Sequence, residues 1–275
     1  MSNVKLSAVL IAMLLVALFT TGCDGVDQTC KVLGICDEPV KAAVFIEIVC
    51  DRSSGSTCTR ESLLESLERV LAFVVDRPGS HVRIWMMGST VDKTVAVAEQ
   101  TIPAVKRGSE RSRRAQTAKI AASARDVLLS GAATAFEAPS VRRSPIAESV
   151  TKIALADAGS LPRKLIVLTD AREVSSLGDF ECGRVPGDAQ FAALLRRLSL
   201  LTPGLLTGVD VTFSYVTSTS VPGRGCIVSI DRDIRVRKLW TAALRGSGAA
   251  TVRIVSGPAD LQDQDGADAP KEAAR

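Results

Sequence analysis

Two apolar runs that each end in an aspartate constrain the fold of this chain more than any other feature. The first run, residues 44–50 (VFIEIVC), is followed by Asp51, and the second, residues 165–168 (LIVL), leads to Asp170. Both runs have the length and the composition of buried β-strands. In open α/β sheets, the loops at the carboxyl ends of parallel strands form the ligand-binding edge. We therefore predict that the two aspartates lie together at such an edge.

Predicted strands and helices alternate along the chain, which indicates an α/β fold. Thr59 is expected to cap a helix that ends before Pro78 and Gly79. Strands over residues 81–87 and 95–102 form a hairpin-like pair, of which the second is expected at an antiparallel edge. We predict a doubly wound, mostly parallel central sheet with helices on both faces and one antiparallel edge strand. Further helices are expected over residues 106–125, 189–201 and 231–244, and another is expected to begin at residues 144–145. Further strands are expected over residues 209–216 and 251–255.

Length and composition favour a single large domain with a leader and a tail. The chain has 275 residues, 46% of them hydrophobic, which is enough for a sizeable core. We predict a lipoprotein-type signal peptide over residues 1–22, a tether over 23–40, the domain over 41–256 and a disordered tail over 257–275. The net charge of +4 is modest and aromatic residues are few, so nucleic-acid binding is not indicated.

The N-terminus has the layout of a secretory signal that ends in a cysteine. Lys5 precedes an apolar stretch over residues 8–19, which is short for a membrane span. Residues 20–23 (TTGC) resemble the lipobox of bacterial lipoproteins, in which the cysteine, here Cys23, becomes lipidated; Thr20 departs from the usual aliphatic residue. The alternatives are an ordinary cleaved signal peptide and a short uncleaved anchor. We expect a protein of the bacterial cell envelope, lipid-anchored to a membrane and facing the periplasm or the exterior.

The cysteine count independently favours an oxidising compartment. The chain has seven cysteines, so an even number remains if Cys23 carries lipid, as disulfide pairing requires. The spacing lacks the Cys-x-x-Cys clusters of structural zinc sites, so we do not expect zinc. Sequence alone does not fix the disulfide connectivity. Pairing each cysteine with its neighbour along the chain suggests the disulfides Cys30–Cys36, Cys50–Cys58 and Cys182–Cys226.

The residues that follow the predicted strands resemble the metal-ion-dependent adhesion site of the von Willebrand factor type A (VWA) family. That family has an Asp-x-Ser-x-Ser loop after its first strand, a threonine at the start of a later helix, and an aspartate after its fourth strand. Asp51 and Ser53 match the first two loop positions. Ser144, in the sequence RSPI, stands at the threonine position, and Asp170, in LTDA, at the second aspartate. The resemblance covers residues 41–256 in the matching order of elements.

The sequence departs from the family at the third loop position, which is Gly55. Glycine offers no side-chain oxygen, so either Ser56 replaces it by a one-residue shift or a water molecule does. The resemblance implies a site for Mg²⁺, or for Mn²⁺ or Ca²⁺, all of which prefer oxygen ligands. It also implies that an acidic side chain of a partner protein completes the coordination of the ion.

Other functions and purely structural roles compete with this hypothesis. Aspartates after strands often accept backbone N–H bonds in turns, and Ser144 before Pro145 is a typical helix cap. A metal-free scaffold of an envelope assembly is one alternative, and Gly55 favours it. A metal-assisted phosphohydrolase is another. We expect no enzyme, because His81 is the only histidine and begins a strand away from either aspartate loop, and because disulfides would consume a cysteine nucleophile.

Two charged features each have two interpretations. The cations of residues 106–125 form either a solvated helix face, which we favour, or a surface for anionic lipid headgroups. Glu47, within the first apolar run, pairs with a cation such as Lys164 or reaches a loop, because an unpaired buried carboxylate is costly.

Overall fold

The chain divides into two units, Met1–Val40 and Lys41–Arg275. The computed structural model describes residues 41–53, 56, 58–105, 109–215, 229–257, 259 and 261, all of which belong to the second unit. The signal peptide, Cys23, the tether with Cys30 and Cys36, Gly55, Cys226 and most of the predicted tail therefore lie outside the described residues.

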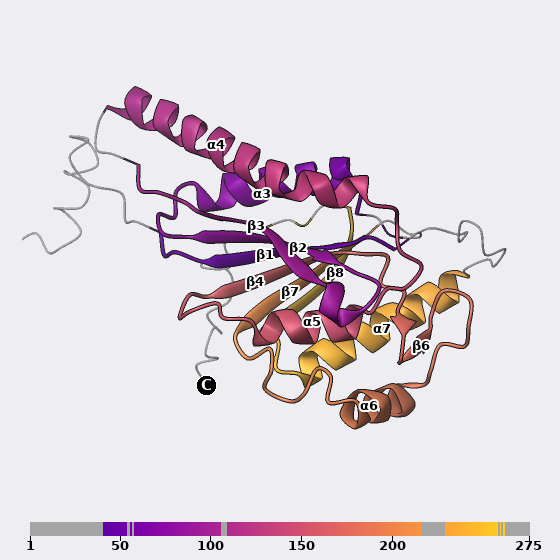
Figure 1. Cartoon of the computed structure of the whole chain (residues 1–275). Coiled ribbons are helices and arrows are strands. Elements are labelled where there is room, and N and C mark those ends of the chain that lie inside the picture. Colours follow the sequence, from indigo (N-terminus) through magenta and orange to yellow (C-terminus); the bar gives the residue numbers. More distant parts are fainter. Residues whose placement is uncertain are drawn as a thin grey trace, which may run out of the picture. The chain divides into compact units, whose positions relative to one another are not determined.

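A six-stranded sheet forms the centre of the second unit (Figure 1). Its strand order is β3-β2-β1-β4-β7-β8, and every neighbouring pair is parallel except β2 and β3. This arrangement confirms the predicted mostly parallel sheet with an antiparallel edge strand. The strands are β1 (Phe45–Asp51), β2 (His81–Met87), β3 (Val95–Thr101), β4 (Arg163–Leu168), β7 (Val209–Tyr215) and β8 (Thr251–Ser256).

Helices cover both faces of the sheet, as the alternation of elements predicted (Figure 1). One face carries α3 (Arg60–Val74) and α4 (Glu110–Glu137), and the other carries α5 (Ile146–Leu155), α6 (Asp188–Arg197) and α7 (Ile230–Gly246). A 3-10 turn, η1 (Val91–Lys93), joins β2 to β3. A small hairpin of β5 (Val174–Ser175) and β6 (Gly178–Asp179) follows β4, where the sequence indicated only a loop. In the described part of the chain, no helix has both the length and the apolar character needed to span a bilayer.

The alternation of side chains along β1 divides the core into two clusters. Val49 belongs to the cluster beneath α5, α6 and α7, whereas Ile48 and Cys50 belong to the cluster beneath α3 and α4. Successive side chains of a strand point to opposite faces, and both faces are covered here. This explains why the first run is apolar throughout instead of alternating between apolar and polar residues.

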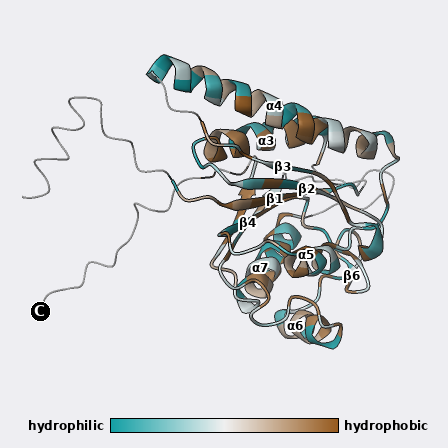
Figure 2. Ribbon diagram, turned by 60° about the vertical axis from the view of Figure 1, so that its left-hand side comes forward, coloured by the Kyte–Doolittle hydropathy of each residue, from teal (hydrophilic) through white to brown (hydrophobic). Residues whose placement is uncertain are grey.

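The two helices on the first face differ in how much of their length is buried. Thr59 caps α3 in a capping box with Ser62, which confirms the predicted cap. Helix α4 extends beyond the predicted range, and only Ala124, Leu128 and Ala132 of it are buried. Its N-terminal half is therefore exposed and largely polar (Figure 2).

Glu47 is fully buried and is held at the amino ends of β1 and β4. Its Oε1 accepts a hydrogen bond from Trp85 Nε1 at 2.8 Å, and its Oε2 accepts one from Arg163 Nε at 2.5 Å. Lys164 instead pairs with Asp210 at 2.7 Å. Lys164 is level with Ile46 in the sheet, so its side chain points to the face opposite Glu47. The suggested Glu47–Lys164 pair was therefore wrong, although the expectation of a cationic partner was right.

Candidate metal site

The candidate site lies where β1 and β4 end side by side. The two strands are parallel, and Cys50 is level with Leu168. Asp51 is the last residue of β1, and Thr169 and Asp170 follow β4 directly. All three of these side chains are buried. The carboxyl edge of the sheet therefore gathers two carboxylates and a hydroxyl, as strand polarity predicted for the aspartates.

Asp51 is the centre of a hydrogen-bond network that joins three segments of the chain. Its Oδ2 accepts hydrogen bonds from Ser144 Oγ at 2.6 Å and from Thr169 Oγ1 at 2.7 Å. Its Oδ1 accepts one from the backbone N–H of Ser53 at 2.9 Å. Burial raises the pKa of Asp51, and the hydrogen bonds from Ser144, Thr169 and Ser53 counteract part of that effect.

Asp170 is satisfied on only one of its two carboxylate oxygens. Its Oδ1 accepts the backbone N–H of Arg172 at 3.0 Å. Its Oδ2 is buried and has no hydrogen-bond partner among the described residues; Arg172 Nη1 lies 3.9 Å away. Burial, followed by the nearby charge of Asp51, raises the pKa of Asp170 to about 7. A buried carboxylate oxygen without a donor is unusual, and a bound cation would explain it.

The loop after β1 supplies a second buried oxygen without a partner. Ser53 is buried, and its Oγ makes no hydrogen bond of normal geometry in the described part of the chain, although the hydroxyl lies near enough to the Asp51 carboxylate to help lower the pKa of Asp51. Ser56 is used differently, because its Oγ donates to the main-chain oxygen of Asp51 and accepts the N–H of Cys58 at 2.9 Å. Ser56 therefore closes the loop, and its hydroxyl is directed at backbone groups.

A disulfide joins the two ends of this loop, as expected. Cys50 and Cys58 are bonded, with their Cα atoms 5.4 Å apart, and both are buried. Cys182 is also disulfide-bonded. The Cys50–Cys58 bond limits the freedom of the short segment that carries Asp51 and Ser53.

Ser144 does not cap a helix, which corrects the role predicted from its position before Pro145. Helix α5 begins at Ile146 with Pro145 as N-cap, and no side chain caps it there. The main chain of Ser144 forms a bridge with Val174, with hydrogen bonds of 3.1 and 3.0 Å. This bridge leaves the Ser144 hydroxyl directed at Asp51. The hydroxyl donates its proton to the Asp51 carboxylate, and hydrogen bonds to ionised groups are stronger than those between neutral groups.

Glu173 and Thr169 are site residues that sequence reasoning missed. Glu173 is fully buried, and its Oε2 accepts the N–H of Ala147 in the first turn of α5 at 3.0 Å. Burial raises the pKa of Glu173 to about 8, and hydrogen bonds from the Ser175 side chain and the Ala147 backbone oppose part of that effect. The signal for Thr169 was its place beside Asp170, since a hydroxyl at a strand end can reach the neighbouring strand's carboxylate.

The donor set fits a hard divalent ion that keeps several water ligands. Asp51, Asp170, Ser53 and Ser144 offer only oxygen atoms, and two of those atoms lack other partners in the described chain. In that part of the chain, no group of three or more Asp, Glu, His or Cys side chains could hold an ion by itself. Hydroxyls and water would therefore have to complete the coordination, a manner of binding that is common for Mg²⁺.

His81 lies at the opposite edge of the sheet from this site. It is the first residue of β2, level with Phe45, whereas Asp51 is level with Met87 at the other end of the strand. Six residues of strand separate the two levels, which is about 20 Å at 3.3 Å per residue. The arrangement therefore does not provide a serine–histidine–aspartate relay at the candidate site.

No protein-family model matches the sequence, and no curated protein sequence is similar to it. Among solved structures, the chain is similar to the pilus adhesin SpaC from Lactobacillus rhamnosus GG, with a TM-score of 0.43 and 11% identity over 81% of this chain and 29% of that one. It is also similar to proximal thread matrix protein 1 from the mussel byssus in two structures. These have TM-scores of 0.35 and 0.33 and identities of 10% and 13%, over 80% and 79% of this chain and 45% and 43% of theirs. The chain thus spans less than half of each of these proteins.

Proposed function

We propose that this chain is a VWA-like binding module of the bacterial cell envelope that holds a partner protein through a divalent metal ion. The observation that carries the proposal is the pair of buried oxygens without hydrogen-bond partners, Ser53 Oγ and Asp170 Oδ2, in the loops that meet at Asp51. Folding does not normally leave such atoms unpaired, because each costs about 1–3 kcal/mol. A cation at this position would satisfy both.

In this proposal Asp51, Ser53, Ser144 and Asp170 hold the ion. Mg²⁺ or Mn²⁺ would supply an electrophilic position at the edge of the sheet that a carboxylate of the partner can occupy. Thr169 orients Asp51 through its hydrogen bond of 2.7 Å. The few charged ligands of the site favour a reversible interaction that chelators would abolish.

The metal-free scaffold is the main alternative, and two observations favour it. Asp51 already accepts three hydrogen bonds from protein groups, and Arg172 lies near Asp170. In a scaffold, these contacts would be sufficient to stabilise the two aspartates, and divalent ions would have no effect. The metal-dependent module and the scaffold therefore differ in whether the protein binds divalent ions, which can be measured directly.

Calorimetric titration with Mg²⁺ and Mn²⁺ distinguishes them. We expect heat of binding from the wild type and its loss in Asp51→Asn and in Asp170→Asn, which keep the shape of the side chains. Asp92→Asn, a change in the exposed η1 turn, serves as the matched control and should bind normally. If the wild type gives no heat with either ion at neutral or alkaline pH, the scaffold is the better explanation. Phosphate-ester turnover that Asp51→Asn abolishes would instead indicate a phosphohydrolase.

The partner and the anchor require separate tests. A pull-down from native envelope in Mg²⁺, repeated in chelator, should retain a partner only in the presence of the ion. Cys23 lies outside the described residues, so its lipidation is proposed from sequence alone. Mass spectrometry of the mature N-terminus should show a diacylglyceryl-modified Cys23, and Cys23→Ser should release the protein from the membrane.

A further inference from the structure

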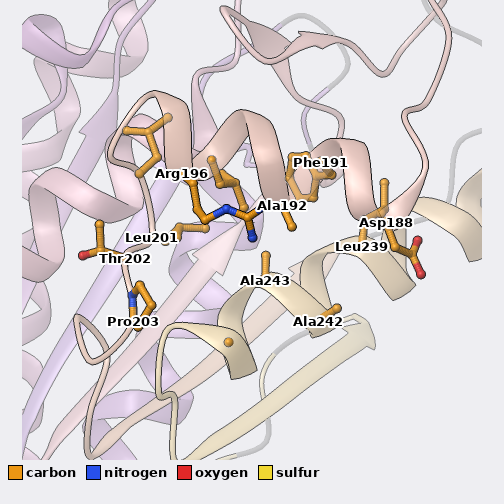
Figure 3. Close-up of a pocket in the computed structure, with 13 residues that line it drawn as sticks. Asp188, Phe191, Ala192, Arg196, Leu201, Thr202, Pro203, Leu239, Ala242 and Ala243 are labelled. Atoms are coloured by element: carbon orange, nitrogen blue, oxygen red, sulfur yellow. The ribbon is translucent and has the colours of Figure 1, made fainter.

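A cavity of about 290 Å³ lies between α6 and α7 (Figure 3). Its floor consists of Phe191, Leu195 and Leu239, which are buried. Ala242 and Gly246, on the exposed side of α7, leave the cavity open to solvent. The volume is close to the lower end of the range of small-molecule sites, about 300–1,000 Å³, and an apolar lining is typical of them.

The wall formed by the segment after α6 is held in an uncommon backbone conformation. Ser199 and Leu201 have φ angles of 54° and 46°, in the left-handed region that non-glycine residues rarely adopt. Two hydrogen bonds fix Leu201: its N–H donates to Thr151 Oγ1 at 3.0 Å, and its carbonyl accepts from Ser247 Oγ at 2.6 Å. Residues in such conformations persist only where their surroundings hold them, and they cluster at ligand-binding positions. The cavity is therefore preformed.

An arginine without a partner lies at this cavity. The side chain of Arg196 extends from α6 toward α7 and is exposed (Figure 3). It makes no ion pair or side-chain hydrogen bond with any described residue. Asp188 lies eight residues earlier on the same helix, about 12 Å away at 1.5 Å per residue, which is too far to neutralise it. A guanidinium beside an apolar cavity is suited to the carboxylate of an amphipathic ligand.

We propose that the α6–α7 cavity binds a single-chain aliphatic carboxylate, with its chain against Phe191 and Leu239 and its head at Arg196. The wall residue Leu201 precedes β7, so this part of the cavity lies toward the amino ends of the strands. The candidate metal site lies at their carboxyl ends. The carboxylate proposal uses none of the candidate metal ligands, so it does not rest on the divalent ion or on the proposed function.

Decanoate is the probe for this proposal, used with the intact protein below the micelle concentration. Equilibrium dialysis gives the affinity, and tryptophan fluorescence reports occupancy, because the Trp240 ring lies 5.7 Å from that of Phe191. Arg196→Gln removes the charge at the head. Arg197→Gln, the neighbouring exposed arginine that does not line the cavity, is the matched control. Ala243→Leu fills the cavity without placing a polar group in it.

We expect saturable binding of decanoate by the wild type and a roughly tenfold loss in Arg196→Gln, the effect of removing one charge-assisted hydrogen bond. Arg197→Gln should bind normally, Ala243→Leu should not bind, and decanol should bind the wild type more weakly than decanoate. Chelator should change none of these results. The proposal is overturned if the wild type does not bind decanoate, if Arg196→Gln and Arg197→Gln lose affinity equally, or if Ala243→Leu binds as well as the wild type.

Discussion

Replacing Ser53 with alanine should stabilise the metal-free protein and weaken metal binding at the same time. Ser53 is 5% exposed, and its Oγ has no hydrogen-bond partner among the described residues. A buried hydroxyl without a partner costs about 1–3 kcal/mol. Because alanine removes the hydroxyl and leaves the rest of the side chain in place, we expect the free energy of unfolding in chelator to rise by about 1 kcal/mol.

When the ion is present, the advantage in stability of the Ser53→Ala variant over the wild type should disappear or reverse. A ligand at one hundred times its dissociation constant stabilises the folded state by about 2.7 kcal/mol. If loss of the Ser53 oxygen weakens Mn²⁺ binding about tenfold, the variant gains only about 1.4 kcal/mol at the same concentration. The difference of about 1.3 kcal/mol cancels or slightly exceeds the expected advantage of the variant in chelator. The variant should therefore be more stable than the wild type only without the ion.

Urea denaturation followed by circular dichroism gives the free energy of unfolding of each protein at pH 8, once in chelator and once in Mn²⁺. Ser144→Ala is the matched control, because it removes a hydroxyl of the same site that does have a partner, Asp51 at 2.6 Å. That variant should lose about 1.5–3 kcal/mol in chelator, the contribution of a hydrogen bond to a charged group. Our reasoning is refuted if Ser53→Ala is destabilised in chelator, or if it is stabilised equally with and without Mn²⁺.

Two further predictions concern pH and the buried pair at the other edge of the sheet. Burial raises the pKa of Asp170 to about 7 and that of Glu173 to about 8, so the folded protein binds protons that the unfolded chain releases. Stability in chelator should therefore fall as pH rises from about 4 to 8, by up to about 1.4 kcal/mol per pH unit for each such proton, and Mn²⁺ affinity should rise toward neutral pH. Urea denaturation at pH 5, 7 and 9 tests this, and stability that is constant or rises over that range would contradict it. Glu47→Ala should cost about 3–5 kcal/mol, because it leaves the buried side of Arg163 unpaired; a thermal unfolding midpoint close to that of the wild type would show that the pair is dispensable.

The sheet was predictable because its strands carry a strong local signal. Burial on both faces requires continuous apolar runs, and such runs marked β1 and β4 to within two residues of their observed bounds. The hairpin of Val174–Ser175 and Gly178–Asp179 was not predictable in this way, because strands of two residues are too short to show a period. Local patterns therefore indicate long elements and leave short ones undetected.

The contacts within the site were less predictable than its residues, because they depend on which segments meet. Ser144 has the local sequence of a helix cap, yet its hydroxyl donates to Asp51, 93 positions earlier in the chain. Glu173 binds the first turn of α5 across a shorter gap of 26 positions. No spacing rule in the sequence relates these positions. The cavity at α6 and α7 was missed for the same reason, since it depends on how two helices pack.

Asp170 shows why a divalent ion fits this site better than the other cations available to it. A proton would neutralise the carboxylate, but the resulting O–H would be a buried donor that still needs an acceptor, and Oδ2 has no partner among the described residues. The Arg172 guanidinium provides opposite charge at 3.9 Å, beyond hydrogen-bond distance, so it leaves the oxygen unsatisfied. A divalent ion provides charge and coordination to the same oxygen at once, and it can share both with Ser53 and Asp51. We therefore expect that, of the three cations, only a divalent ion would satisfy both Ser53 Oγ and Asp170 Oδ2 without a further partner from the protein.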